Sequence, residues 1–217
     1  MIETEELKYP TDDWTKTIKA GILPIPDTTS STYNINIGIK GNEALKIQAP
    51  NGVKTLMLNG DWSQYTGTLT IPSNITKICF SNQEIPFNIV ANHNLEFGIT
   101  QPTTKTQQST TAQTLPGLFG TLVSTAQQST NTNSNLTAGT LKFSGNLSEC
   151  TGTISFDKSV SKIILSTDNP TFAIGGDSDL VIGVSDLTSN AVTLKSSILN
   201  RKGTVTLDES VKTVTLK

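Results

Sequence analysis

Residues 55–100 read TLMLNGDWSQYTGTLTIPSNITKICFSNQEIPFNIVANHNLEFGIT, and residues 140–185 read TLKFSGNLSECTGTISFDKSVSKIILSTDNPTFAIGGDSDLVIGVS. The two stretches align without a gap, at a constant offset that takes Thr55 to Thr140, and both contain the element Thr-Gly-Thr. A third, shorter copy covers residues 203–216. Self-similarity of this kind is the sequence signature of a repeat architecture.

Within each copy, apolar and polar residues alternate with a period of two. In residues 68–71 the threonines fall on one face of the chain and the aliphatic residues on the other, and residues 153–156 and 204–207 repeat this pattern. Alternation among β-branched residues is typical of strands with one buried face. No stretch of a dozen residues shows a helical period, so the sequence predicts little helix.

The same alternation predicts which side chains form the core. We expect the threonines of the pattern to face away from the core: Thr68, Thr70, Thr153 and Thr204. We expect the following apolar residues to be largely buried: Leu56, Leu58, Leu69, Ile71, Ile78, Leu141, Phe143, Ile154, Phe156, Ile163, Leu165, Val205 and Leu207.

Strand starts recur at a short, regular interval. The series 33, 53, 75, 95 and the series 140, 160, 180 advance by about 20 residues, so the offset between the two copies is close to four such steps. A coil of this length cannot bury its apolar face alone, and neighbouring coils must stack. The sequence predicts an all-β, parallel β-solenoid (β-helix) of about 20-residue coils, with 53–58, 75–80 and 95–100 stacked in parallel. The alternative is two tandem β-sandwich domains, because a repeat as long as this offset also suits a sandwich.

The pattern divides the chain into four segments. They are an N-terminal segment (1–20), a first solenoid block (21–100), a polar segment (101–137) and a second solenoid block (138–217). The polar segment is rich in Thr, Gln, Ser and Asn, and it carries one charged residue, Lys105. Such composition is typical of a linker or a long solvated loop. Alternatively, its apolar island supplies a strand near Leu118 that keeps the coil in step.

Composition and charge exclude several classes of protein. Sixteen basic and eighteen acidic residues give a net charge of −2, which leaves no basic footprint for nucleic acid. No apolar run approaches the roughly 20 residues that span a bilayer. Residues 1–6 are acidic where a secretory signal is basic and then apolar. We therefore expect that the protein stays inside the cell or that an export signal lies upstream of this chain.

One recurring element resembles a known family of surface proteins. Residues 60–71 and 145–156 both fit Gly-[Asp/Asn]-x-Ser-x-x-Thr-Gly-Thr-x-x-[Ile/Phe]. This element resembles the β-strand repeats in the passenger regions of bacterial autotransporters and similar large surface adhesins, over roughly residues 53–217. The resemblance implies a parallel β-helix that projects from a cell surface, hence an extracellular or cell-surface location. Residues 69–78 are similar, more weakly, to bacterial-surface leucine-rich repeats.

Few residues are candidates for catalysis or metal binding. His93 is the only histidine, so no imidazole cluster can form, and we expect an exposed loop residue. Residues 175–179 (GGDSD) could contact a calcium ion, but their counterparts at 90–94 lack the carboxylates. We therefore expect a plain turn at 175–179. No phosphate-binding loop, nucleophile elbow or zinc-ligand spacing occurs.

Aromatic residues and cysteines have structural interpretations. Asp61, Trp62 and Tyr65 suggest a sugar-stacking platform, but their counterparts in the second copy are not aromatic, so we expect packing at a corner. Cys79 and Cys150 occupy non-equivalent positions in the repeat, which favours two free, partly buried thiols over a disulfide. Three glycosylation sequons, at Asn74, Asn135 and Asn146, are expected by chance in a chain of this composition.

The sequence predicts a non-catalytic structural or adhesive repeat protein of a cell or particle surface. No constellation of titratable residues recurs, so we expect no catalytic residues, no cofactor and no metal. We expect other surface subunits or glycans as partners, and no nucleic acid. Two alternatives remain: a polysaccharide-active β-helix enzyme, whose carboxylates would come from different coils, and an ice- or crystal-surface binder. The chain stops at Lys217 without a polar cap, so we expect a longer rod or end-to-end self-association.

Overall fold

The computed structural model describes residues 15–17, 21–100, 136–166, 172–185, 188 and 190–217. These residues form short strands and one 3-10 helix, with no α-helix among them. The elements are β1 (Thr15–Thr17), β2 (Gly21–Pro24), β3 (Thr32–Ile35), β4 (Gly38–Lys40), β5 (Leu45–Gln48), β6 (Thr55–Leu58), β7 (Thr68–Thr70), β8 (Lys77–Phe80), β9 (Glu84–Ile85), β10 (Asn88–Val90), β11 (Leu95–Ile99), β12 (Thr140–Phe143), β13 (Thr153–Phe156), β14 (Lys162–Leu165), β15 (Ala173–Ile174), β16 (Leu180–Val184), β17 (Ala191–Leu194), η1 (Ser196–Asn200), β18 (Val205–Leu207) and β19 (Thr213–Leu216).

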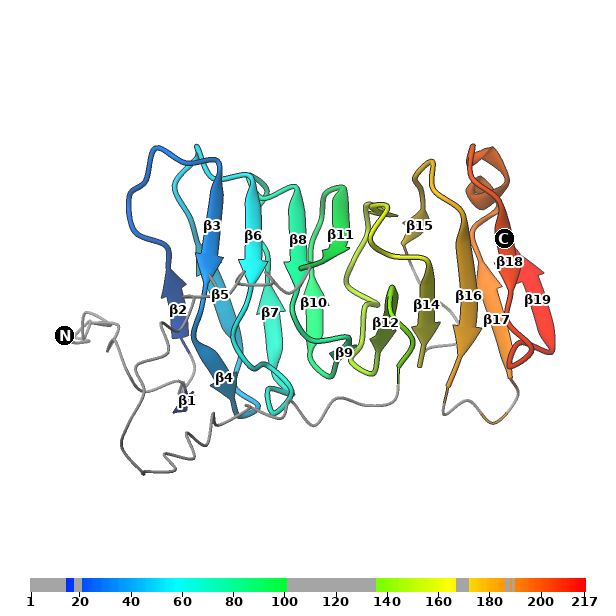
Figure 1. Ribbon diagram of the computed structural model, residues 1–217, viewed down its shortest axis with the longest axis horizontal. Coiled ribbons are helices and arrows are strands. Elements are labelled where there is room, and N and C mark those ends of the chain that lie inside the picture. Colours follow the sequence, from blue (N-terminus) through cyan, green and yellow to red (C-terminus); the bar gives the residue numbers. More distant parts are fainter. Residues whose placement is uncertain (1–14, 18–20, 101–135, 167–171, 186–187, 189) are drawn as a thin grey trace, which may run out of the picture.

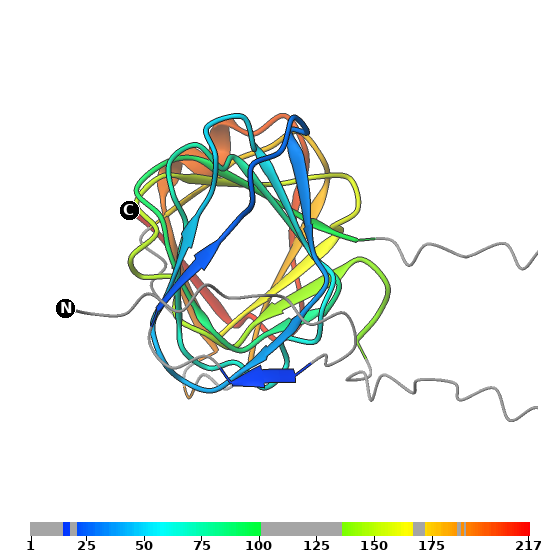
Figure 2. The ribbon, with the colours of Figure 1, turned by 90° about the vertical axis from the view of Figure 1, so that its left-hand side faces the viewer.

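The strands wind into a β-solenoid of about seven turns, with coils of about 22 residues. Figure 1 shows the strands side by side along the rod, and Figure 2 looks along its axis. Three sheets run along the rod. We call them sheet I (β10-β7-β5-β2), sheet II (β15-β13-β11-β8-β6-β3) and sheet III (β18-β16-β14-β12-β9). The pairs β1–β4 and β17–β19 form two further sheets, and all strand pairs among the described residues are parallel.

The predicted parallel solenoid is confirmed. Strands β6, β8 and β11 stack in sheet II, and Leu56, Ile78 and Phe97 form one inward-facing row. Each of these side chains is fully buried. A single coil would leave its apolar face exposed to solvent, and the next coil in the stack covers that face. Parallel pairing between successive coils excludes the tandem β-sandwiches, which are built from antiparallel sheets.

The division of the offset between the two copies into four coils was wrong. Leu56 in β6 lies in sheet II, whereas its counterpart Leu141 in β12 lies in sheet III. The same shift to the next sheet separates β8 from β14 and β11 from β16. The chain completes two turns between β6 and β11, and the long segment 101–135 then precedes β12. The two sequence copies are therefore related by a change of sheet as well as by a shift along the rod.

The two repeat blocks share one stack. Strand β11 pairs with β13, and β9 pairs with β12, so strands before the polar segment contact strands after it. The proposed in-step strand near Leu118 lies outside the described residues. The division into four segments stays a prediction.

The core prediction is confirmed except at the C-terminal end. All predicted core residues between Leu56 and Leu165 are buried, and none of the four threonines is. In β18, however, Val205 is only partly buried and Leu207 is 45% exposed. The prediction was wrong there because burial in a solenoid depends on the next coil, and no described strand stacks on the outer side of β18.

Candidate functional site

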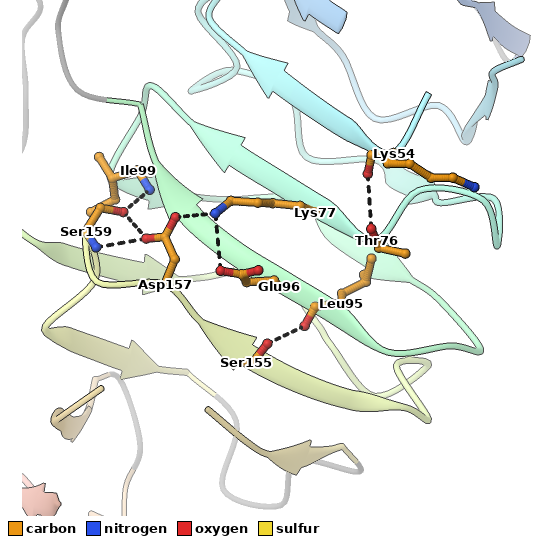
Figure 3. A network of polar contacts seen from close by, with 9 residues as sticks. All are labelled: Lys54, Thr76, Lys77, Leu95, Glu96, Ile99, Ser155, Asp157 and Ser159. Atoms are coloured by element: carbon orange, nitrogen blue, oxygen red, sulfur yellow. Dashed lines mark hydrogen bonds and ion pairs between the residues drawn. The ribbon is translucent and has the colours of Figure 1, made fainter. Parts of the chain in front are cut away.

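Charged side chains converge on the outer surface of sheet II, as Figure 3 shows. Lys77 lies in β8, Glu96 lies in the neighbouring β11, and Asp157 directly follows β13, the next strand of the sheet. The Nζ atom of Lys77 is 2.6 Å from Oδ2 of Asp157 and 3.2 Å from Oε1 of Glu96. One ammonium group therefore connects three successive strands of the sheet.

A serine fixes the Asp157 carboxylate in place. Oδ1 of Asp157 accepts hydrogen bonds from the backbone N–H of Ser159, at 2.8 Å, and from its hydroxyl group. The Ser159 hydroxyl oxygen in turn accepts the N–H of Ile99 at 2.8 Å. Gly98 lies directly beneath, and a Cβ atom there would overlap the Asp157 carboxylate. A glycine at this position thus leaves room for the Asp157 carboxylate to lie over β11.

The same arrangement recurs on sheet III. Lys162 in β14 lies 2.5 Å from Oδ2 of Asp208, which follows β18. Oδ1 of Asp208 accepts the N–H of Ser210 at 3.0 Å, and the Ser210 hydroxyl oxygen accepts the N–H of Val184 at 3.1 Å. Gly183, in the strand between them, again makes room, because a Cβ atom there would press on Asp208 and Ser210.

We call each arrangement a staple. Staple 1 comprises Lys77, Gly98, Asp157 and Ser159, and staple 2 comprises Lys162, Gly183, Asp208 and Ser210. Each staple joins three neighbouring strands of one sheet, through an ion pair between the outer two and hydrogen bonds to the middle one. The residue beside each staple differs: Glu96 also binds Lys77 next to staple 1, whereas Val181 occupies the equivalent place next to staple 2.

The electrostatics of the staples keep their groups charged. Burial lowers the pKa of Lys77, but the hydrogen bonds with Asp157 and Glu96 outweigh it, and the net pKa is raised. Burial raises the pKa of Asp157, yet the hydrogen bonds from Lys77 and Ser159 leave it below its ordinary value. The hydrogen bond from Lys162, followed by those from Ser210, lowers the pKa of Asp208 to about 2. These groups are therefore suited to ion pairing and not to proton transfer at neutral pH.

The repeat pattern did not reveal the staples, and the expectation that no titratable constellation recurs was wrong. The four residues of a staple are repeated at two different sequence offsets. The offset between the two long copies relates the lysines and the glycines of the staples. A different and shorter offset, the one that takes Gly152 to Gly203 in the third copy, relates the aspartates and the serines. No single alignment of the chain to itself therefore places all four residues together.

His93 is not the exposed loop residue that we expected. Its side chain is half-buried, and Nε2 lies 2.7 Å from the carbonyl oxygen of Ile75 in the preceding coil. The expectation was wrong because this loop is a corner of the solenoid, and a corner residue packs against the coil stacked on it. The histidine thus helps to hold two corners together.

The acidic turn at 175–179 is bound by the following coil. The Asp179 Oδ1 atom accepts the N–H of Thr204 at 2.8 Å, and the Asp177 carboxylate is 3.3 Å from Lys202. The Arg201 guanidinium donates to the carbonyl oxygen of Ser178 at 2.6 Å. Across the described part of the chain, no group of three or more His, Cys, Asp or Glu residues could hold a metal ion.

The aromatic corner is structural, as predicted. Trp62 and Tyr65 are each only 2% exposed, so neither ring face is open to a sugar. Their rings meet edge to face at 5.9 Å between centroids, and both contact Phe87, at 5.7 and 5.4 Å. The Tyr65 hydroxyl group reaches the carbonyl oxygen of Glu43 at 2.9 Å, and burial raises its pKa to about 12.

Both cysteines are buried thiols and neither is in a disulfide, which confirms the prediction of two thiols. Burial raises the pKa of Cys79, and it raises that of Cys150 to about 11, so neither is an activated nucleophile. Of the sequon asparagines, Asn74 donates its side-chain amide to the carbonyl oxygens of Pro50 and Val53. Asn146 is exposed, and Asn135 lies outside the described residues.

Comparisons with known proteins add no family to this picture. No family model, curated protein or solved structure matches the chain. In the described part of the chain, no helix has the length and apolar character that crossing a membrane requires.

We predict that Asp208→Asn destabilises the protein in a pH-dependent way. The folded pKa of Asp208, about 2, lies below its ordinary value of 3.8, so the carboxylate stabilises the fold fully above the ordinary value. That contribution disappears as the pH falls through the folded pKa. Urea unfolding should give a difference between wild type and D208N that is constant above about pH 5 and shrinks toward pH 2.

Asp177→Asn provides a matched control. Asp177 and its partner Lys202 are both largely exposed. Surface ion pairs of this kind contribute about 0–1 kcal/mol to the free energy of unfolding. We therefore expect a small effect from D177N at every pH. A destabilisation by D208N that is the same at acidic and neutral pH would contradict the assigned role of the carboxylate.

Proposed function

We propose that the chain is a non-catalytic scaffold, a rigid solenoid rod that presents its outer faces and corners at a cell or particle surface. The observation that carries this proposal is the pair of staples. The charged constellation that recurs in the described residues is neutralised within the chain and connects neighbouring strands of the stack. Paired groups of this kind add rigidity and register, and they leave no reactive group for a substrate.

The staples also bear on the enzymatic alternative. A glycoside hydrolase needs one carboxylic acid of raised pKa and a second carboxylate on the other side of the scissile bond. Glu96 and Asp157 come from neighbouring strands, as a β-helix enzyme would require, but both bind Lys77. The pKa of Asp157 is lowered. This arrangement favours a structural role over catalysis.

The threonine pattern gives little support to an ice- or crystal-surface binder. Such a binder would need threonines in equivalent positions on successive coils. On sheet I, the neighbours of Thr70 are Lys46 and Val90, and on sheet III, Thr206 lies beside Val181. The threonines thus belong to different sheets and form no continuous ladder.

End-to-end self-association fits the exposure at the C-terminal end of the rod. In the first described coil, Leu23 and Ile25 are buried, whereas Leu207 and Leu216 are each 45% exposed in the last coil. Among the described strands, β18 pairs only with β16 and β19 only with β17, so each has one open edge. Open edges with apolar side chains favour pairing with another chain. The proposed partner is a second copy of this protein.

A glycan screen tests the non-catalytic part of the proposal. The intact chain should hydrolyse none of a panel of plant, bacterial and animal polysaccharides. Asp157→Asn and Glu96→Gln should be indistinguishable from wild type in this assay. Turnover that either substitution abolishes would overturn the scaffold proposal in favour of the enzyme.

Light scattering after size-exclusion chromatography tests self-association. We expect the mass of the wild-type chain to rise with concentration, and Leu216→Lys to return it to the monomer, because a charge would be buried at the contact. Ile22→Lys is the matched control, since Ile22 is similarly exposed (50%) but lies on the outer face of sheet I. A monomer at all concentrations whose residues 203–217 are protected from hydrogen exchange would contradict self-association.

A further inference from the structure

Two Asn-Gly pairs lie in the described part of the chain, and their surroundings are opposite. The first is Asn51-Gly52, in the turn between β5 and β6, and the second is Asn59-Gly60, just after β6. We propose that Asn51 is a site of spontaneous deamidation and isoaspartate formation, whereas the fold protects Asn59. This modification site is independent of the scaffold role proposed above.

The chemistry needs only the chain and water. The backbone nitrogen of the glycine, once deprotonated, attacks the side-chain carbonyl carbon of the asparagine. A C–N bond forms, the bond to the side-chain nitrogen breaks, and ammonia leaves, which gives a five-membered succinimide. Water then opens either carbonyl of the ring, so the product is aspartate or isoaspartate. Glycine favours this reaction because it has no side chain to hinder the attack.

The geometry at Asn51 permits ring closure. Asn51 and Gly52 are both exposed, at the centre of a turn that the N–H of Val53 closes on the carbonyl oxygen of Pro50, at 3.0 Å. A Cβ atom at Gly52 would meet no atom within 4 Å, so the space around the attacking nitrogen is open. Within the described contacts, the Gly52 N–H has no hydrogen-bond acceptor.

The geometry at Asn59 opposes ring closure. Gly60 is buried, and its N–H donates to the carbonyl oxygen of Ile35 at 3.2 Å. The Asn59 side-chain amide is also engaged, because Nδ2 donates to Oδ1 of Asn34 at 3.2 Å and of Asn36 at 3.1 Å. Attack by the Gly60 nitrogen therefore requires local opening of the corner.

Modification at Asn51 should weaken the contact between this turn and the next coil. The carbonyl oxygens of Pro50 and Val53, on either side of the pair, accept the Asn74 amide at 3.0 and 3.2 Å. Isoaspartate inserts one extra backbone carbon into this turn and adds a negative charge. The spacing of the two carbonyl groups then no longer matches the Asn74 amide, so the two stacked corners should loosen.

Peptide mapping by mass spectrometry of the folded full-length chain, after incubation at mildly alkaline pH, tests the proposal. An isoaspartate-specific carboxyl methyltransferase serves as a second readout. Deamidation at Asn51 should exceed that at Asn59 by more than about tenfold in the folded chain, and the two rates should converge in denaturant. Gly52→Ala, for which the turn has room, should suppress the reaction at Asn51 without loss of stability.

Three outcomes would overturn the proposal. The first is equal deamidation at the two sites in the folded chain. The second is an Asn51 that stays intact in the folded chain while it reacts in denaturant. The third is a Gly52→Ala variant that deamidates as fast as wild type. Because the mapping reads each site separately, none of these outcomes depends on whether the scaffold proposal holds.

Discussion

Gly145→Ala is expected to lower the free energy of unfolding by about 3–5 kcal/mol or to prevent folding. Gly145 is buried at the corner that follows β12, and its N–H donates to the carbonyl oxygen of Ile85 at 3.0 Å. A Cβ atom there would lie far inside van der Waals contact with the Phe87 carbonyl group of the adjacent coil. The obstacle is backbone, so no rotamer change can relieve it, and the two coils must separate.

Gly52→Ala is the matched control for this prediction. Gly52 also lies at a corner, but a Cβ atom at that position meets open space. We expect a change of less than about 1 kcal/mol, with stabilisation the favoured sign because alanine restricts the unfolded chain. Urea unfolding of both variants measures the difference. A loss below about 1 kcal/mol for G145A would contradict the close stacking of these corners.

Much of the fold could be predicted from the sequence because its causes are local. Alternation with a period of two identifies a strand and its buried face, and a fixed interval between strands identifies the coil. Leu56, Ile78 and Ile154 were assigned to the core on this basis, and each is fully or almost fully buried. The absence of aromatic counterparts to Trp62 and Tyr65 correctly indicated corner packing.

The arrangement of the coils could not be predicted in the same way. A sequence offset does not show which sheet each strand joins, so the division of the offset between the two copies into four coils was wrong. The burial of a side chain at an end of the rod also depends on whether another coil stacks on it, and the alternation of apolar and polar residues does not show this. Leu207 continues the alternation that buries Leu69, yet it is exposed because no described strand stacks beyond β18.

The staples show the same limit for the candidate site. Lys77 and Asp157 are far apart in sequence and meet only because β13 follows β11 in sheet II. A glycine at position 98 marked the contact, but a lone glycine in a strand has several explanations. Only the stacking order shows that Asp157 needs the space that Gly98 leaves.

Phe97→Ala is expected to destabilise the protein by about 3–5 kcal/mol, because it leaves a cavity in a fully buried position. The Phe97 ring lies between the two repeat blocks. Its centroid is 5.4 Å from that of Phe80 in the first block, and 5.6 and 6.1 Å from those of Phe143 and Phe156 in the second. Such ring pairs contribute about 0.5–1.5 kcal/mol beyond burial.

The larger effect of Phe97→Ala should be on the cooperativity of unfolding. The free energy of unfolding of a solenoid is approximately the sum of contributions from each coil and from each interface between coils, so a weakened interface lets the parts on either side unfold separately. Trp62 is buried in the first block, so its fluorescence reports on the N-terminal side of the junction, whereas circular dichroism reports on all strands. For F97A, the urea transition followed by tryptophan fluorescence should no longer coincide with the one followed by circular dichroism. Phe172→Ala is the control, because Phe172 is also buried but precedes β15, which among the described strands pairs only with β13 of the second block; this variant should lower stability and keep the transitions coincident. Coincident transitions in both variants would show that Phe97 does not couple the blocks.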